Sequence, residues 1–541
     1  MSKMNIRRDQ QMSTVIKPVM IMMVVTLWSI FASAQDASPI PYLQNKGKAV
    51  QLMVDDKPFL MIAGELHNSS SSTTSYMQPI WEKLVAGNLN TVLAVVSWQQ
   101  IEPQEGVFDF TLVDSLLKEA GKNRLKLVLL WFGTWKNGES SYTPDWLKKD
   151  TKRFFRVRTR DGKNIETISP FCDAARQADK KAFRALMSHL AEVDKERTVI
   201  MMQPENEMGV FQEIDFCPQA LKQFEGQAPS KLIQYVTKNE KTLYPILRNQ
   251  WVNNGRKMKG TWKEIFGDTP YTKEFFMAWQ YASYVNEVAG AGKEVYPLPM
   301  FVNAWIIQNP QQLPGEYPNG GPVSRVLDIY KAAAENIDIL SPDIYLPDFK
   351  QVVSEYIRKD NPLLVPESKY EPGRAFYAFA ECDALGFAIF GIDSQVTKPL
   401  LIGTHKVLSD LQSLILQYQG TGRMRGFLKY KEKGTTLTLG DYIFNVTYND
   451  ESAFGLMIQT APEEYLVAGM NFKATVTSVK KDKTAYFLQI WEGDYKEGHW
   501  EPIRLLNGDE TLHNSTFFAS GVRKQDTTIP AIYKIKVYTR D

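Results

Sequence analysis

The chain has 541 residues, more than one ordinary domain holds, so we expect one large domain followed by a smaller one. Hydrophobic residues make up 44% and charged residues 23%, a balance that excludes a disordered chain. The formal charge of +2 comes from residues 1–34, which hold a net +3 and so leave a net −1 for the remainder. The sequence therefore offers no basic surface for nucleic acid.

Residues 1–34 are predicted to be a signal peptide. Basic residues precede the apolar run Val19–Phe31, and Ala32-Ser33-Ala34 has the small-x-small pattern of a cleavage site. The alternative is a membrane anchor, but the run is shorter than the roughly 20 residues of a spanning helix. We therefore expect an exported bacterial protein, either periplasmic or secreted.

Eight short apolar runs, separated mostly by longer amphipathic stretches, follow along the chain. Runs of this length between polar segments are typical of strands buried on both faces. Helical stretches such as Pro79–Ala86 and Leu112–Ala120 lie between them and stop at glycines. The expected strands are Phe59–Glu65, Thr91–Trp98, Lys126–Phe132, Thr198–Gln203, Leu298–Asn303, Ile337–Ser341, Pro362–Pro366 and Gly386–Ile392.

This alternation predicts an α/β fold in which residues 35–420 form a (β/α)8 TIM barrel. A doubly wound open sheet is the competing interpretation, and the strand count favours the barrel. The segment 208–297 is too long for one helix, so we expect extra helices there, over the active-site face. Residues 421–541 alternate in polarity, which predicts a C-terminal antiparallel β-sandwich domain. We expect this domain to buttress the barrel, with sugar binding as the alternative.

The carboxyl ends of barrel strands hold the catalytic side chains, and here these ends are acidic and aromatic. Carboxylates and amides bind sugar hydroxyls, and aromatic rings stack on the C–H face of a sugar. Because the sequence has no Cys/His metal pattern and no glycine-rich phosphate loop, we expect neither a metal nor a cofactor. The strand-end residues are Glu65, His67, Trp98, Gln99, Trp131, Trp135, Glu205, Asn206, Glu207, Asn303, Trp305, Asp343, Tyr345, Glu367 and Asp393.

Glu207 and Glu367 are the residues from which a function is predicted. Glycoside hydrolysis needs one carboxylic acid to protonate the leaving oxygen and a second carboxylate to attack the sugar or to activate water. Glu207 ends the fourth expected strand and Glu367 the seventh, so they would face each other across the barrel mouth. The acid needs a raised pKa, to which Glu205 and the ionised nucleophile would contribute.

The segment Q-P-E-N-E-M-G (203–209) is similar to the Q-I-E-N-E-Y-G motif of glycoside hydrolase family 35, the β-galactosidases of clan A. The segments A-G-E-L-H (63–67), 89–110 and T-P-D-W-L (143–147) resemble further motifs of the same family. The resemblance extends over roughly residues 55–400. It implies a retaining exo-β-galactosidase that acts on a carbohydrate partner.

The resemblance also implies roles for individual residues. Glu207 would be the acid/base and Glu367 the nucleophile. Asn206 would bind the 2-hydroxyl of the sugar, and Glu205 would bind other ring hydroxyls. Independently of the resemblance, the position of Tyr345 at a strand end leads us to expect that it donates a hydrogen bond to Glu367. The further substrate-binding candidates are Glu65, His67, Trp98, Gln99, Trp135, Lys136 and Asn137.

The sequence departs from the family pattern at several pocket positions. Val95 stands where the family has a sugar-contacting tyrosine, Trp135-Lys136-Asn137 replaces Cys-Ala-Glu, and Gln99 replaces asparagine. These differences indicate a distinct subgroup, for which plant-wall oligosaccharides such as xyloglucan side chains are a plausible substrate. The alternatives are another clan A β-glycosidase (a β-glucosidase, an arabinosidase or an endo-glycanase) and an inactive carbohydrate-binding protein.

Overall fold

The computed structural model describes residues 38–496, 498–524 and 526–541, of which Ile40–Asp541 belong to one structural unit. The expected signal peptide lies outside the described residues. Within the described part of the chain, no helix combines the length and the hydropathy that crossing a bilayer requires.

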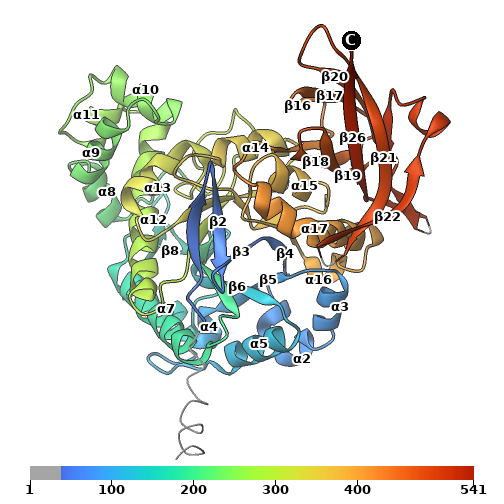
Figure 1. The fold of residues 1–541 in the computed structure, drawn as a ribbon. Coiled ribbons are helices and arrows are strands. Elements are labelled where there is room, and N and C mark those ends of the chain that lie inside the picture. Colours follow the sequence, from blue (N-terminus) through green and yellow to red (C-terminus); the bar gives the residue numbers. More distant parts are fainter. Residues whose placement is uncertain (1–37, 497, 525) are drawn as a thin grey trace, which may run out of the picture. The chain divides into compact units, whose positions relative to one another are not determined.

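Each of the eight apolar runs contains a strand, and helices separate most of them (Figure 1). Parallel pairing joins the strands in the orders β12-β14-β4-β5-β6-β9 and β10-β11-β13. An isolated parallel bridge between Met202 and Met300 links β9 to the segment that leads into β10. The strands are β4 (Met61–Glu65), β5 (Thr91–Ser97), β6 (Lys126–Lys136), β9 (Val199–Asn206), β10 (Phe301–Trp305), β11 (Ile339–Ile344), β12 (Leu364–Val365), β13 (Glu367–Ser368) and β14 (Gly386–Phe390).

Pro366 divides the seventh expected strand into β12 and β13. Proline has no backbone N–H, so it cannot donate to the ladder of hydrogen bonds. The half before it pairs with β14 and the half after it pairs with β11. This strand therefore takes part in both parallel sheets.

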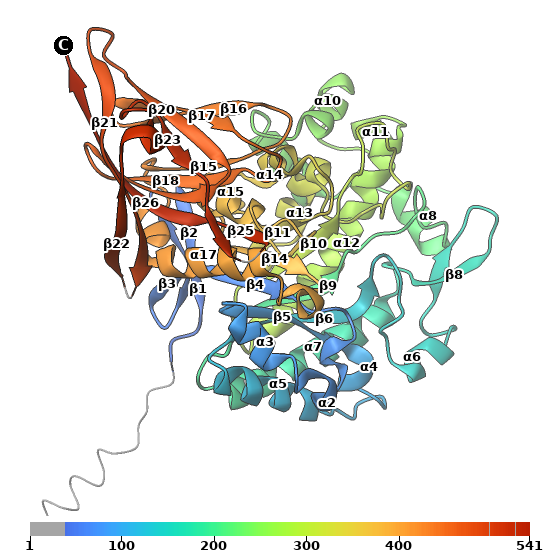
Figure 2. The same ribbon diagram turned by 90° about the vertical axis from the view of Figure 1, so that its right-hand side faces the viewer.

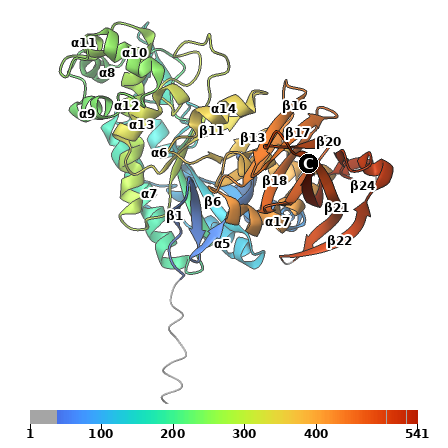
Figure 3. The ribbon, with the colours of Figure 1, turned by 45° about the horizontal axis from the view of Figure 1, so that its top comes forward.

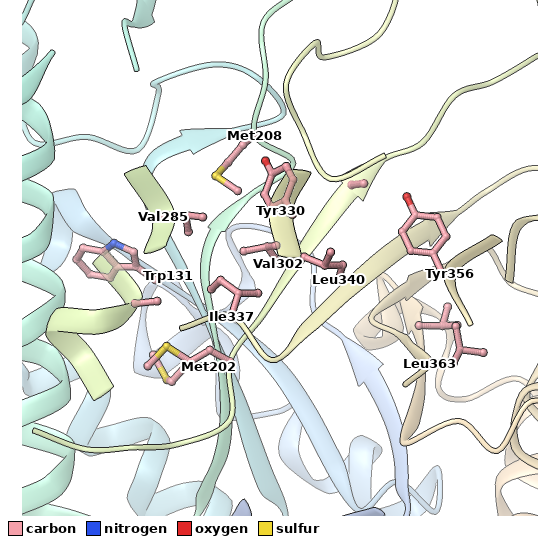
Figure 4. Packing of buried hydrophobic residues seen from close by; sticks show 14 of the residues in the cluster. Trp131, Met202, Met208, Val285, Val302, Tyr330, Ile337, Leu340, Tyr356 and Leu363 are labelled. Carbon is pink, nitrogen blue, oxygen red and sulfur yellow. The ribbon is translucent and has the colours of Figure 1, made fainter. Parts of the chain in front are cut away.

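The parallel strands are buried on both faces, as their continuous apolar sequence predicts. On β6, Leu127 belongs to the apolar cluster that the strands share with the helices, whereas Val128 belongs to a second cluster. The second cluster also receives side chains from β4, β5, β9, β10, β11, β12 and β14. Figure 4 shows part of the first cluster, where Val302 of β10 lies beside its register partner Leu340 of β11.

Helices between the strands include α3 (Trp81–Ala86), α4 (Trp98–Ile101), α5 (Thr111–Lys122), α7 (Asp173–Val193), α13 (Leu327–Ala333), α14 (Phe349–Tyr356) and α17 (Pro399–Tyr418). The long segment after β9 does contain several helices. Of these, α12 packs against α7, and α8 to α11 gather on one side in Figures 1 and 3. Their bounds are α8 (Pro218–Phe224), α9 (Ser230–Lys238), α10 (Pro245–Asn253), α11 (Trp262–Phe266) and α12 (Pro270–Lys293).

The C-terminal part of the chain consists of antiparallel strands (Figure 2). One sheet has the order β15-β18-β19-β26-β21-β22 and another the order β16-β17-β20-β23. Both sheets contribute to one apolar cluster, for example through Phe444 of β17 and Ile535 of β26. The strands are β15 (Met424–Leu428), β16 (Gly434–Leu439), β17 (Tyr442–Tyr448), β18 (Phe454–Ala461), β19 (Glu464–Met470), β20 (Phe472–Ser478), β21 (Thr484–Lys496), β22 (His499–Leu506), β23 (Phe517–Ala519) and β26 (Ala531–Arg540).

A small antiparallel sheet that the sequence analysis did not identify precedes β4. It consists of β1 (Tyr42–Lys46), β2 (Ala49–Val54) and β3 (Lys57–Phe59). Leu52 and Val54 of β2 join the second apolar cluster of the parallel strands.

Candidate active site

The carboxyl ends of the parallel strands bring four carboxyl groups and one lysine together. Glu65 is the last residue of β4, Glu207 follows β9, Asp343 lies near the end of β11, and Glu367 begins β13. Lys136 ends β6. All five side chains are buried, with at most 6% of any residue exposed. Their charges must therefore be balanced within the site, because water does not reach them freely.

Glu207 and Glu367 lie close to each other, as their positions at strand ends predict. Carboxylate oxygens of Glu207, Asp343 and Glu367 all lie within 4.8 Å of one another. Glu207 has a left-handed backbone with a φ of 42°, which few non-glycine residues adopt. Its N–H donates to Asn303 Oδ1 at 2.9 Å, and its carbonyl accepts from the N–H of Gly138 at 3.0 Å. These bonds hold the turn that presents Glu207.

Glu207 has the ionisation behaviour that an acid/base needs. Burial, followed by the negative charge of Glu367, raises the pKa of Glu207 to about 7. Lys136 and a hydrogen bond with Asp343 act in the opposite direction. Glu205, which we expected to help raise the pKa of Glu207, does not contribute to this rise. A carboxyl group with this pKa can both give and take a proton near neutral pH.

Glu367 is surrounded by groups that favour its negative charge. Tyr345 Oη donates to Glu367 Oε2 at 2.7 Å, which is the hydrogen bond expected from the sequence. Lys136 Nζ lies 4.0 Å from Glu367 Oε1. Asn303 Nδ2 donates to Asp343 Oδ2 at 2.7 Å and lies 3.5 Å from Glu367 Oε1. Asn303 was expected at a strand end, without a role. Its amide oxygen accepts from the backbone N–H of Glu207, and its amide nitrogen lies near the carboxylates of Asp343 and Glu367.

Glu65 and Asn206 have buried polar atoms that no described residue satisfies. Both carboxylate oxygens of Glu65 and both amide atoms of Asn206 lack a hydrogen-bond partner. Burial, followed by the charge of Glu367, raises the pKa of Glu65 well above its ordinary value, so this group can donate as well as accept. Asn137 Oδ1 is also buried and without a partner in the described part of the chain. Such groups normally bind water or a ligand, and sugar hydroxyls fit them.

His67 lies at the rim of the site. Its side chain is 48% exposed, and its Nδ1 lies 2.9 Å from Asp393 Oδ1. Its ring meets Phe390 edge-on, with centroids 5.4 Å apart. These contacts orient the imidazole, which is consistent with a residue that shapes the pocket.

The structure corrects the expectation that Trp98 and Trp135 contact substrate. Both indoles are fully buried, with 0% exposed. Trp98 Nε1 donates to Glu102 Oε2 at 2.8 Å, and Trp135 Nε1 donates to the carbonyl of Ile168 at 3.1 Å. Each ring is therefore part of the layer behind the strands. The cause is local, because α4 begins at Trp98 and β6 runs on through Trp135.

Other aromatic rings are accessible near the strand ends. Trp305, the last residue of β10, is half-buried and meets Phe211 edge-on at 5.5 Å between centroids. Phe211 and Tyr345 are 47% and 42% exposed. These rings, and not the buried tryptophans, can stack on a sugar.

The structure also corrects the expected contact between Glu205 and ring hydroxyls. The Glu205 carboxylate is fully buried and accepts from the backbone N–H groups of Thr134 at 3.2 Å and Trp135 at 2.7 Å. Burial and the nearby charge of Asp179 raise its pKa well above the ordinary value. Glu205 thus ties β9 to β6 and lies near Asp179 of α7. The sequence carried no signal for Asp179, which lies within α7.

Gln99 also lies outside the cluster of acids. It is an exposed residue of α4, and its Oε1 accepts from Lys148 Nζ at 3.4 Å. Its expected contact with substrate therefore has no support from its position.

Glu207, Asp343 and Glu367 have the spacing that could hold a metal ion. Their surroundings argue against one, because Lys136 already brings a positive charge within 4.0 Å of Glu367. Burial and the charge of Glu367 also raise the pKa of Asp343 well above its usual range. The donor set fits acid/base chemistry better than metal binding.

Two buried carboxyl groups on different strands, one with a raised pKa and one surrounded by donors, make a site of the glycoside hydrolase type. Residues 51–271 match the family model Glycosyl hydrolases family 35, which confirms the resemblance carried by the motifs at 63–67, 89–110 and 203–209. The chain is related to this family over residues 51–271. Residues 402–518 match a second model, Domain of unknown function (DUF5597).

The chain is also similar to individual proteins that are described as beta-galactosidases. A Beta-galactosidase of Xanthomonas manihotis is 29% identical over 171 residues, which are 30% of this chain and 26% of that protein. The chain thus spans about a quarter of the length of this curated relative. The solved structure of Gan42B, a GH42 beta-galactosidase from G., is 12% identical with a TM-score of 0.51 and covers 88% of this chain and 98% of its own. A beta-galactosidase from Bacillus circulans sp. alkalophilus is 15% identical with a TM-score of 0.44 and covers 67% and 57% of the two chains. At 12% identity, the structure with a TM-score of 0.51 establishes a shared fold only.

Proposed function

We propose that this chain is a retaining exo-β-galactosidase, with Glu207 as the acid/base and Glu367 as the nucleophile. The spacing of the two carboxylates carries the proposal, since their oxygens lie within 4.8 Å of each other. Retaining glycosidases hold the two carboxyl groups about 5–5.5 Å apart, whereas inverting enzymes leave roughly 6.5–9.5 Å for a water molecule.

The reaction proceeds in two displacements. Glu367 attacks the anomeric carbon while Glu207 protonates the departing oxygen, which gives a covalent glycosyl ester on Glu367 and a free alcohol. Glu207, now ionised, takes a proton from water, and the water oxygen attacks the anomeric carbon to release the sugar and free Glu367. Tyr345 and Lys136 stabilise the charge on Glu367 before the attack and after the release.

The unsatisfied buried groups support a proposal for the sugar-binding side chains. Asn206 binds the 2-hydroxyl, next to the reacting carbon, and Glu65 binds another ring hydroxyl. Asn137, which stands where the family has a glutamate, is the remaining candidate for hydroxyl recognition.

The names of the related proteins support galactose as the sugar that is released. The departures at Val95, Lys136 and Asn137 support a substrate that differs from that of typical members, for which we propose galactosylated plant-wall oligosaccharides such as xyloglucan side chains.

We also propose that the eight strands close into a (β/α)8 barrel. The support is that strands of both parallel sheets share one apolar cluster and that Met202 and Met300 bridge them. The proposed domains remain 35–420 and 421–541, and the second family model begins inside α17, at residue 402. Export of the chain rests on the sequence of residues 1–34 alone.

A panel of aryl glycosides tests the sugar. Hydrolysis of the β-D-galactoside, well above that of the β-D-glucoside and the α-L-arabinoside, supports the proposal. Turnover of another glycoside without turnover of the galactoside would leave a retaining glycosidase but remove galactose. Hydrolysis of none of them, with the purified folded protein, would favour an inactive carbohydrate-binding protein.

Azide rescue with an activated aryl galactoside tests the two roles. Glu367→Gly should yield α-galactosyl azide, because azide enters on the face that the nucleophile has vacated. Glu207→Gly should yield β-galactosyl azide, because azide attacks the covalent intermediate from the opposite face. The same anomer from both variants, or no azide product from either, contradicts the assignment.

A further inference from the structure

A second cavity lies next to the loops that carry the candidate active site. It has a volume of about 340 Å³ and is lined by residues 306–310 after β10, by the loop after β11, by α14, by the start of α10 and by Arg325. Ile306 directly follows Trp305, and Leu346 directly follows Tyr345, whose hydroxyl donates to Glu367. Consecutive Cα atoms are about 3.8 Å apart, so the cavity begins within one residue of the catalytic cluster.

Arg325 is a buried cation that lines this cavity, and one of its N–H groups has no hydrogen-bond partner in the described part of the chain. Only 5% of the residue is exposed, yet its Nη1 has no hydrogen-bond partner among the described residues. Its guanidinium stacks on Tyr271 and Tyr317, at 5.4 and 5.6 Å from the ring centroids. No carboxylate of the described residues forms an ion pair with it. A buried N–H group without an acceptor is unfavourable, so an oxygen from outside the chain is the natural partner.

The remaining lining of the cavity mixes acceptors, donors and rings. Glu355 offers carboxylate oxygens, Gln308 and Gln351 offer amides, and Tyr244 offers a half-buried ring. A sugar hydroxyl both donates and accepts, and the C–H face of a sugar stacks on aromatic rings, so this lining suits a neutral saccharide. An acidic sugar fits less well, since Glu355 and Asp348 outnumber the single guanidinium.

The position of the cavity determines which part of a substrate it can hold. The sugar that is cleaved off occupies the strand ends, where Glu207, Glu367 and Asn206 are buried. The cavity is formed by the loops after β10 and β11, by α14 and by the start of α10, one of the helices inserted after β9. A saccharide chain that leaves the catalytic cluster past Trp305 and Tyr345 would therefore reach it, because Ile306 and Leu346 adjoin those two residues.

We propose that this cavity is a subsite for the neutral saccharide chain that remains after cleavage, with Arg325 as its hydrogen-bonding anchor. The inference deepens the proposed function and rests on it for the identity of the substrate. It makes the start of α10 part of substrate recognition, and it predicts that long substrates bind better than aryl galactosides.

Calorimetric binding of a degalactosylated xyloglucan oligosaccharide tests the subsite without relying on catalysis. Gln351→Trp places a large ring in the cavity from an exposed position of α14 and should weaken binding at least about tenfold. Ser354→Trp, on the same helix but outside the cavity lining, is the matched control and should bind like the wild type. Arg325→Met should weaken binding as well, by removing the anchor.

Kinetics separate this inference from the proposed function. Gln351→Trp should lower kcat/KM for a galactosylated oligosaccharide about tenfold and leave that for an aryl β-galactoside unchanged. No binding of the oligosaccharide by the wild type, or equal binding by Gln351→Trp, overturns the subsite. If the wild type binds the oligosaccharide but hydrolyses neither galactoside, the proposed function fails and the subsite stands.

Discussion

Replacing Glu207 by glutamine should stabilise the folded protein at alkaline pH and have much less effect at acidic pH. The pKa of Glu207 is raised from 4.5 to about 7 by burial and by the charge of Glu367. A carboxyl group with a raised pKa holds its proton more tightly when folded. Its contribution to stability is therefore full below the unfolded pKa of 4.5 and is lost as pH rises through about 7.

The size of this effect follows from the shift. A shift from 4.5 to about 7, at about 1.4 kcal/mol for each pH unit, amounts to about 3 kcal/mol between pH 4.5 and pH 8.5. Glutamine has nearly the same shape and never ionises, so the variant should keep this energy at pH 8.5. The wild type, in contrast, must hold two buried negative charges close together.

Urea unfolding followed by tryptophan fluorescence at the two pH values measures the difference. The quantity of interest is the free energy of unfolding of Glu207→Gln minus that of the wild type. Glu82→Gln, the same exchange at an exposed position of α3, is the matched control. A Glu207→Gln difference that is the same at both pH values would refute the reasoning, because Glu207 would then ionise in the folded protein as easily as in the unfolded chain.

Three further predictions concern catalysis. The kcat/KM for an aryl galactoside should fall as pH rises through about 7, because the free enzyme needs protonated Glu207; a rate that stays level to pH 9 would contradict this. Tyr345→Phe should lower kcat roughly tenfold by removing the 2.7 Å hydrogen bond to Glu367, and an unchanged kcat would show that this bond is dispensable. Lys136→Met should move the alkaline limb of the pH profile upward, because Lys136 lowers the pKa of Glu207; a downward shift would reverse the sign inferred here.

The strands could be predicted from the sequence because they are buried on both faces. In runs such as Thr91–Ser97, apolar residues follow one another without polar residues between them. A helix on the protein surface would instead have a polar residue at every third or fourth position. The division of the seventh strand into β12 and β13 could not be predicted from the sequence. Pro366 is visible in the sequence, but only the pairing shows that the two halves belong to different sheets. The small sheet before β4 has short edge strands, which carry a weak signal.

The two main carboxylates could also be predicted, but the direction of their neighbours could not. In a regular strand, successive side chains point to opposite faces. At the end of β9, Glu205 and Glu207 both have a positive φ, 65° and 42°, so the alternation fails there. A motif with two nearby glutamates therefore gave two candidates for the site, although one of them points into the layer behind the strands. For the same reason, the sequence could not show that the side chains of Trp98 and Trp135 are buried behind the strands and do not contact substrate.

The three residues Trp135, Lys136 and Asn137, which differ from the family pattern, have different structural consequences. Trp135 is a core residue, so its exchange changes packing and not recognition. Lys136 lies 4.0 Å from Glu367 and is the cation within a cluster of four carboxyl groups, so its exchange changes the electrostatics of the reaction. Asn137 alone keeps an unsatisfied oxygen, on a backbone with a φ of 54°. Among these three positions, a difference in sugar preference from typical members should therefore trace to Asn137, since the other two already have partners within the protein.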